Sequence, residues 1–151
     1  MATHSSYYAV YKLRFSVALE DPDITSLRYH AVIFLETSAD NSRIMYHVIG
    51  DIASGMSHQS KPFQNPEMSR TFHSKGLLRW THPIVWDNLL QAVPVPKKQK
   101  SFNIKSMKTE PFKTLNTLTF YKPGERRRPL VKCTEWTEQR AIPAHLSFNG
   151  F

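Results

Sequence analysis

Three apolar segments of strand length, all in the first third of the chain, constrain its fold more than any other feature. Residues 7–19 are rich in aromatic and β-branched side chains whose apolar members recur at a period of two, which is typical of a strand with one buried face. Those members are Tyr11, Leu13, Phe15 and Val17. Residues 30–36 and 43–49 flank a turn-like segment, 38–42, and we expect them to pair as a β-hairpin.

The middle of the chain alternates short elements with loops. The glycines and prolines of residues 50–66 predict a loop, and residues 72–80 fit a short strand. Residues 84–93 fit one short helix that Pro94 stops, and residues 117–121 fit a further strand.

The last element is predicted to be a helix that begins at Cys133. Acidic residues in its first turns and Arg140 near its end give the charge order that suits a helix dipole, and Pro143 should kink or end it. The chain has no internal repeat and no long linker. The sequence therefore predicts a single α+β domain over residues 1–151, with an antiparallel β-sheet packed against this C-terminal helix.

Composition excludes several classes of protein. The 9 Phe, 6 Tyr and 3 Trp are too many for a disordered chain, and a single cysteine cannot form a disulfide framework. No run of about 18 apolar residues is present, so we expect no transmembrane segment. The first residues lack the basic and apolar regions of a signal peptide, and we expect a cytoplasmic protein whose cysteine stays reduced.

Positive charge is concentrated in one segment. The net charge is +8, but residues 97–132 contain eleven Lys and Arg against only Glu110 and Glu125, so this segment alone carries +9. Such a segment is suited to nucleic acid, an acidic protein, an anionic membrane surface or an acidic small molecule. Its prolines and glycine favour exposed turns, and no recognition helix or RNP-type motif accompanies them. A set of solvated loops is the alternative interpretation.

Cys133 is the residue with the most chemical potential. At the start of a helix it meets unpaired backbone N–H groups and the positive end of the dipole, which lower the pKa of a thiol. Lys132 and the arginines at 126–128 add positive charge. The alternative is that Cys133 is a small buried apolar side chain.

A nucleophilic cysteine needs a base, usually a histidine that a third polar group holds in place. Of the seven histidines, His30 and His47 lie within apolar strand-like segments, where an imidazole needs a partner to offset its desolvation. The alternative for each is a core histidine with satisfied hydrogen bonds.

The segment His30-Ala-Val-Ile-Phe-Leu-Glu36, followed by Ile44-Met-Tyr-His47-Val48, resembles the strand pair of the circularly permuted NlpC-type papain-like fold. The pattern is similar to that of the lecithin retinol acyltransferase-like and PPPDE-like proteins, in which the order is also His, His, Cys. The matching segments cover about 35 of the 151 residues. Lys-Cys133-Thr-Glu-Trp replaces the Asn-Cys-Glu-His-Phe of that family, and no membrane helix follows. Small fungal proteins with His-x-x-Ile-Phe-Leu-Glu-Thr and Cys-x-Glu-Trp segments are also similar, which implies no particular reaction.

The resemblance implies a permuted papain-like domain that acts as a cysteine hydrolase or acyltransferase on a small-molecule, peptide or thioester carbonyl. Cys133 is then the nucleophile and His30 its base, while His47 orients the imidazole. Glu36 and Asp51 are alternative orienting groups and, with Trp136, the candidate substrate contacts. No cofactor is expected. A metal site built from Cys133 and the two histidines lacks the usual paired ligand spacing, so no metal is expected either.

Two other classes of function remain open from the sequence. A Cys–His pair also suits proton transfer in a cyclase or isomerase of small-molecule biosynthesis. A non-catalytic module would instead bind an anionic partner, nucleic acid or an acidic protein, through residues 97–132. The residues do not indicate an oligomeric state.

Overall fold

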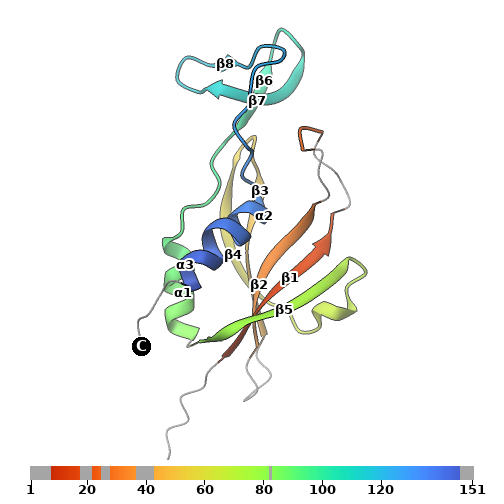
Figure 1. Cartoon of the computed structure of the whole chain (residues 1–151), viewed down its shortest axis with the longest axis vertical. Helices are drawn as coiled ribbons and strands as arrows, with labels where there is room; N and C mark the ends of the chain where they lie inside the picture. The colour runs from red at the N-terminus through yellow and green to blue at the C-terminus, as the bar shows by residue number, and fades with distance from the viewer. Residues whose placement is uncertain (1–7, 18–21, 25–27, 37–42, 82, 147–151) are drawn as a thin grey trace, which may run out of the picture.

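A computed structural model describes residues 8–17, 22–24, 28–36, 43–81 and 83–146. Five antiparallel strands form the main sheet in the order β4-β3-β2-β1-β5, and three more form a small sheet in the order β6-β7-β8 (Figure 1). The main-sheet strands are β1 (Tyr8–Ser16), β2 (Tyr29–Glu36), β3 (Arg43–Asp51), β4 (Gly55–Pro62) and β5 (Phe72–Thr81). The small-sheet strands are β6 (Lys100–Asn103), β7 (Lys108–Thr114) and β8 (Thr119–Phe120).

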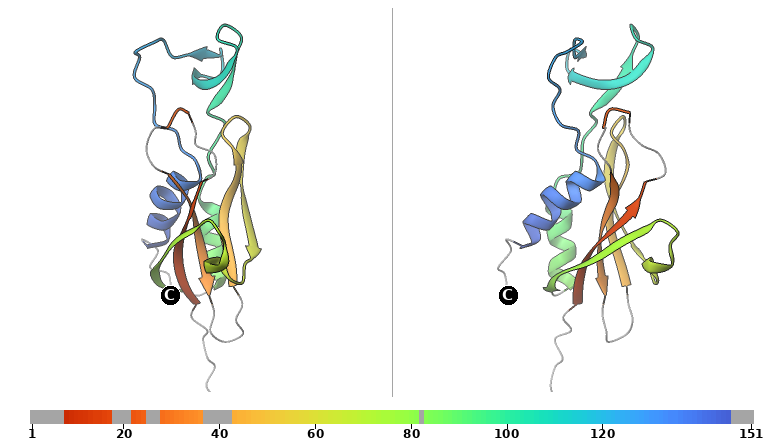
Figure 2. Two further views of the ribbon diagram at one scale, coloured as in Figure 1. Left: turned by 90° about the vertical axis from the view of Figure 1, so that its right-hand side faces the viewer. Right: turned by 45° about the vertical axis from the view of Figure 1, so that its right-hand side comes forward.

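The helices confirm the α+β class. Helix α1 (Pro83–Ala92) follows β5, and the C-terminal helix runs through α2 (Cys133–Glu135), a π-helical stretch (Trp136–Ala141) and α3 (Ile142–Leu146). A short 3₁₀ turn, η1 (Pro66–Met68), precedes β5. Both long helical segments lie on the same side of the main sheet, and the small sheet forms one end of the elongated molecule (Figure 2). No helix in the described part of the chain is long and apolar enough to span a membrane.

Strand β2 is central and covered on both faces. Its residues Ala31 to Leu35 are all at most 1% exposed, which explains why the sequence there is a continuous apolar run. On one face, Ile33 and Leu35 pack with the C-terminal helix and α1 around Trp136. On the other face, the predicted strand residues of β1 pack with β2 and the aromatic rings that flank η1: Tyr11, Leu13, Phe15, Val32, Phe34, Phe63 and Phe72. Only Val17, beyond β1, departs from the predicted face, because it is exposed.

The region predicted to be a loop contains a strand. Residues 55–62 form β4, which pairs with β3 from Asp51↔Gly55 to Ile44↔Pro62. Gly50 and Gly55 make the intervening turn possible, because both have φ near +100° and a Cβ on Gly50 would lie 3.1 Å from the Gly55 carbonyl oxygen. The glycines therefore close a hairpin rather than end the sheet.

The basic segment is also more ordered than predicted. It contains β6 and β7 as well as β8, and β8 is shorter than the strand expected over residues 117–121, because Thr117 adopts φ +57° in a turn. Pro143 does not end the C-terminal helix. The Ile142 N–H reaches back to the Thr137 carbonyl in the wider π-helical pattern just before this proline, and the helix continues to Leu146.

Candidate active site

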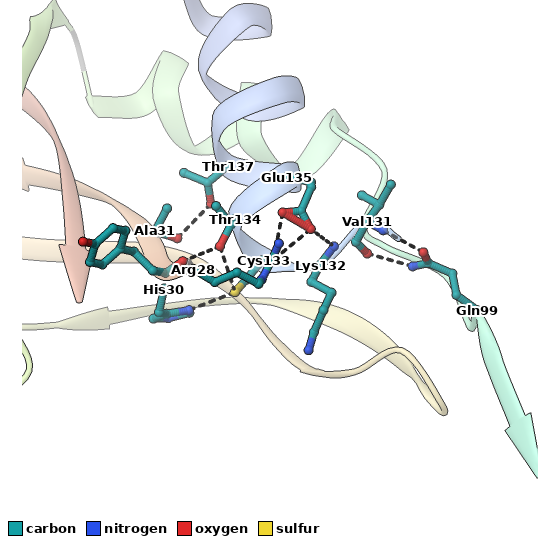
Figure 3. A network of polar contacts seen from close by, with 11 residues as sticks. Arg28, His30, Ala31, Gln99, Val131, Lys132, Cys133, Thr134, Glu135 and Thr137 are labelled. Carbon is teal, nitrogen blue, oxygen red and sulfur yellow. Dashed lines mark hydrogen bonds and ion pairs between the residues drawn. The ribbon is translucent and has the colours of Figure 1, made fainter. Parts of the chain in front are cut away.

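Helix α2 is held against the N-terminal half of β2. The ladder between β2 and β3 runs from Glu36↔Arg43 to Ile33↔Tyr46 and stops there. Beyond it, two threonine hydroxyls of the C-terminal helix donate to β2 carbonyls: Thr134 to Tyr29, and Thr137 to Ala31 at 2.9 Å (Figure 3). The helix start thus takes the place of β3 along this part of β2.

Cys133 and His30 meet at this junction. His30 lies between the two β2 carbonyls that the threonines hold, and its Nδ1 is 3.1 Å from the Cys133 Sγ (Figure 3). Both side chains are half-buried. The sequence separation of the pair is 103 residues, so it is the tertiary fold that brings the two together.

A second histidine and a glutamine extend the pair into a chain of hydrogen bonds. His30 Nε2 lies 3.2 Å from His47 Nδ1, and His47 Nε2 lies 2.6 Å from the Gln59 side-chain oxygen. Gln59 is directly opposite His47 across the β3–β4 ladder, which explains how a strand residue can reach the imidazole. The order Cys133, His30, His47, Gln59 therefore runs from the helix start across β2 and β3 to β4.

Comparison with known proteins places the chain in a family. A model of a family of unknown function, DUF6540, matches residues 17–146. The chain belongs to the DUF6540 family. No curated protein and no solved structure matches it. The DUF6540 match covers all four side chains of the hydrogen-bonded chain and the small sheet.

Burial sets the protonation of the DUF6540 site. Burial raises the pKa of the Cys133 thiol, although hydrogen bonds from Thr134 and the charge of Arg28 act in the opposite direction. Burial and the neighbouring His47 and Lys61 lower the pKa of His30 to about 4. We expected the helix start to lower the pKa of the thiol, and this expectation is wrong. The pKa is raised, because desolvation of the thiolate outweighs the groups that stabilise it. At neutral pH the resting pair is a neutral thiol and a neutral imidazole.

The Gln59 oxygen fixes which nitrogens carry protons. An amide oxygen only accepts, so His47 Nε2 donates to it. Burial lowers the pKa of His47, so its imidazole is neutral and its Nδ1 accepts the Nε2–H of His30. His30 Nδ1 is then unprotonated and faces the Cys133 thiol, which is the orientation that a base for the thiol needs.

Two of the predicted site residues lie elsewhere. Glu36 is at the opposite end of β2 from His30, about 20 Å along the strand, where it pairs with Arg43 and Lys75. The Asp51 carboxylate accepts the backbone N–H groups of Ala53 and Ser54 in the β3–β4 turn. The structure brings neither carboxylate to His30, because each is bound by partners near its own strand end.

Trp136 is near the site but is buried in the core. Its indole N–H donates to the Pro94 carbonyl at 3.0 Å, and its ring meets the edge of His58. It lines a cavity of about 110 Å³ together with His47 and Gln59. Among the residues that the structure describes, no group of three or more His, Cys, Asp or Glu side chains is arranged to hold a metal ion.

Sequence reasoning misses Gln59, the two threonines and Arg28. Gln59 is hidden because the sequence of its strand predicts a loop, and the signal that could have found it is the Gly50–Gly55 hairpin turn. Arg28 pairs with Glu135 at 2.8 Å, and Glu135 also accepts the Lys132 backbone N–H at 3.0 Å. This carboxylate thus fixes the start of the helix that carries Cys133 and holds a cation beside it.

Proposed function

We propose that this DUF6540 protein is a cysteine-dependent hydrolase or acyltransferase with Cys133 as nucleophile and His30 as general base. The observation that carries the proposal is the 3.1 Å contact between Cys133 Sγ and His30 Nδ1. We infer from the contacts with His47 and Gln59 that this nitrogen carries no proton. The order of the site, two histidines on adjacent strands and a cysteine at a helix start, supports kinship with the permuted papain-like fold. A reduced thiol is needed throughout, which favours a cytoplasmic location.

The reaction begins when a carbonyl group arrives next to the thiol. His30 Nδ1 takes the thiol proton while the sulfur attacks the carbonyl carbon, and the carbonyl π electrons move to oxygen. The backbone N–H of Cys133 at the helix start is the candidate donor to this oxyanion, and one such donor contributes about 3 kcal/mol. The imidazolium keeps its Nε2–H on His47, which holds the ring in place.

The tetrahedral intermediate collapses and expels the leaving group, which takes the proton from His30. A thioester remains on Cys133. Water, or an acceptor alcohol or amine, then loses a proton to His30 as it attacks this thioester, and the product acid, ester or amide leaves with Cys133 restored as a thiol.

A groove beside the helix start is the candidate approach for the substrate. Its volume is about 490 Å³, and Arg28, Arg127, Leu130 and Glu135 are among the residues that line it. Arg28 is paired with Glu135 and Arg127 with Asp23, and neither Cys133 nor His30 lines the groove, so it is a path toward the helix start and not the reacting position itself.

The neutral resting pair also suits proton transfer without acylation. A cyclase or isomerase would use the Cys133–His30 pair on one side of a small substrate, taking a proton from one substrate atom and returning it to another. This second candidate differs from the first because no covalent bond to Cys133 forms.

An activated ester tests the proposal. We expect p-nitrophenyl acetate to release nitrophenolate in a burst and to leave one acetyl group on Cys133, seen by intact-mass and peptide mass spectrometry. Cys133→Ala abolishes both signals, and His30→Gln slows acylation by about 100-fold or more. His58→Gln is the matched control, because His58 is an exposed histidine outside the hydrogen-bonded chain, and it leaves the rate unchanged.

Two results would overturn the proposal. One is nitrophenolate release by the Cys133→Ala variant at the wild-type rate. The other is acylation of Cys133 that His30→Gln leaves unchanged, because the cysteine would then react without a base. Circular dichroism and urea unfolding of each variant separate loss of chemistry from loss of fold.

A further inference from the structure

The small sheet presents apolar side chains to solvent in a repeated pattern. Each of its two turns has four residues, and each turn carries an exposed aliphatic side chain at its first and last position. In the first turn these are Ile104 and Met107, at 79% and 69% exposure, and in the second Leu115 and Leu118, at 48% and 43%. Four such side chains in fifteen residues are far more than a solvated loop needs.

The first turn is braced so that its apolar side chains stay outside. The Met107 N–H donates to the Asn103 carbonyl at 2.7 Å, and the Glu110 carboxylate accepts from both the Asn103 amide and the Ser106 hydroxyl. Met107 has φ +58°, a left-handed conformation that is unfavourable for a residue with a side chain and that glycine or asparagine usually occupies. The turn thus holds a methionine outward in a conformation that its own preferences oppose.

Positive charge that has no acidic partner lies next to these side chains. Lys105 and Lys108 are exposed, and within the described part of the chain their ammonium groups make no ion pair. Lys113 and Arg127 are engaged, since Lys113 pairs with Glu125 and Arg127 pairs with Asp23, whereas the other exposed cations of the segment lie away from the aliphatic side chains of the first turn in sequence. Aliphatic and free cationic groups therefore meet at the first turn.

We propose that the first turn of the small sheet docks on an anionic lipid surface, with Ile104 and Met107 entering the headgroup boundary and Lys105 and Lys108 contacting the lipid phosphates and carboxylates. Leu115 and Leu118 lie at the opposite end of β7 and are not needed for this contact. Binding at a lipid interface combines buried apolar area with attraction between lysines and anionic lipids. The small sheet forms one end of the molecule, so docking through its first turn leaves the main sheet and Cys133 in solution (Figure 2). The proposal does not depend on catalysis by Cys133.

The chemistry of the turns favours lipid over the other anionic partners. Nucleic-acid readers place polar side chains on base edges, stack aromatic rings on bases, or insert apolar side chains into a minor groove that arginines hold. The first turn, residues 104–107, has no arginine and no aromatic side chain for such contacts. An acidic protein would use both kinds of group only if it carried an apolar patch next to its acidic residues, whereas an anionic lipid interface presents apolar chains and negative headgroups together everywhere.

Vesicle sedimentation tests the proposal. We expect the full chain to bind phosphatidylcholine vesicles that contain roughly one-third phosphatidylserine, and not pure phosphatidylcholine vesicles. Lys105→Glu with Lys108→Glu weakens binding by roughly 30-fold or more, because each lysine near such a surface contributes about a factor of five. Ile104→Ser with Met107→Ser weakens it by about tenfold or more, because two aliphatic side chains no longer enter the interface.

The matched control replaces exposed apolar residues of the main sheet region. Met68→Ser with Leu77→Ser removes two side chains of 83% and 56% exposure, and vesicle binding stays at the wild-type level. Equal binding to both kinds of vesicle, or binding that Ile104→Ser with Met107→Ser leaves unchanged, overturns the proposal. The proposal is also overturned if the protein binds a DNA oligonucleotide tightly and does not bind vesicles, because the partner is then nucleic acid. Unchanged urea midpoints in all variants show that the fold is intact.

Discussion

The Cys133 site and the small sheet differ in which groups they bury: the site buries polar groups, and the small sheet exposes apolar ones. At the site, a thiol, two imidazoles and an amide are withdrawn from water and satisfy one another along one chain of hydrogen bonds. In the small sheet, aliphatic side chains stand in solvent on braced turns. A desolvated polar group lowers the stability of a fold, and an exposed apolar side chain contributes none of the stability that its burial would give. Regions that break the usual pattern in this way are where function is expected.

The difference also indicates which region carries the stability. The main sheet is packed on both faces, and the site is embedded in that packing through Trp136, Thr137 and the β2 strand. The small sheet is joined to it by backbone bonds from Gln99 and Lys100 to the Ile52 carbonyl and by the ion pair between Lys100 and Asp23, and its strands add no residue to either apolar cluster. The main sheet can therefore hold unfavourable groups in place, while the small sheet is expected to contribute little to global stability.

The largest expected effect compares one aromatic residue from each region. Trp136→Ala removes a buried side chain and its hydrogen bond to Pro94, and should lower the free energy of unfolding by about 3–5 kcal/mol. Phe102→Ala, at a half-exposed position of β6, should lower it by under about 1 kcal/mol. Urea unfolding followed by fluorescence and circular dichroism measures both. Similar losses for the two variants would mean that both sheets share one core.

The sequence predicts most of the main sheet well, and it predicts the edge strand β4 and the small sheet poorly. The strands β1 to β3 and helix α1 lie near their predicted positions, because burial on one or two faces leaves a periodic or continuous apolar pattern. β4 reads Gly-Met-Ser-His-Gln-Ser-Lys-Pro and is an edge strand, so little apolar pattern marks it. β6 and β7 pack against little else, and backbone pairing alone leaves no apolar pattern in a sequence.

The candidate site follows the same division. His30, His47 and Cys133 stand out because polar or reactive groups interrupt apolar or helix-start patterns. Gln59 does not stand out, because a glutamine among polar residues carries no signal until the β3–β4 register places it opposite His47. Glu36 is noticeable in the sequence only as a charge in an apolar segment, and it lies at the opposite end of β2 from His30. The pKa of the Cys133 thiol also depends on how deeply the tertiary fold buries it, and no local sequence pattern encodes that burial.

The buried histidines should make stability depend on pH. The pKa of His30 is lowered to about 4 in the folded protein from 6.5 in the unfolded chain, so between these values the unfolded state binds more protons. The contribution of neutral His30 to the free energy of unfolding is therefore fully present above pH 6.5, and it is lost as the pH falls toward 4. For His30 alone we expect a loss of roughly 2 kcal/mol between pH 7.5 and pH 5. Urea midpoints at a series of pH values measure the slope.

Substitution of the histidine separates this effect from general acid destabilisation. His30→Gln should flatten the slope between pH 7.5 and pH 5, and His58→Gln, at an exposed position of β4, should retain it. His47 contributes in the same direction, because burial also lowers its pKa. A slope that survives in the His30→Gln variant at full size would show that His30 is not desolvated, and the contrast between the two regions would lose its main support.

The smallest expected effect concerns the hydroxyls that fasten the helix start to β2. Thr137→Val keeps the shape of a fully buried side chain but removes its hydrogen bond to the Ala31 carbonyl, which is left without this donor inside the core. We expect a loss of about 1–2 kcal/mol in the free energy of unfolding. Thr109→Val, at an exposed position of β7, should change stability by less than about 0.5 kcal/mol. Equal effects would mean that the hydroxyl of Thr137 is no more important to the fold than one in solvent, and that packing alone positions Cys133 next to His30.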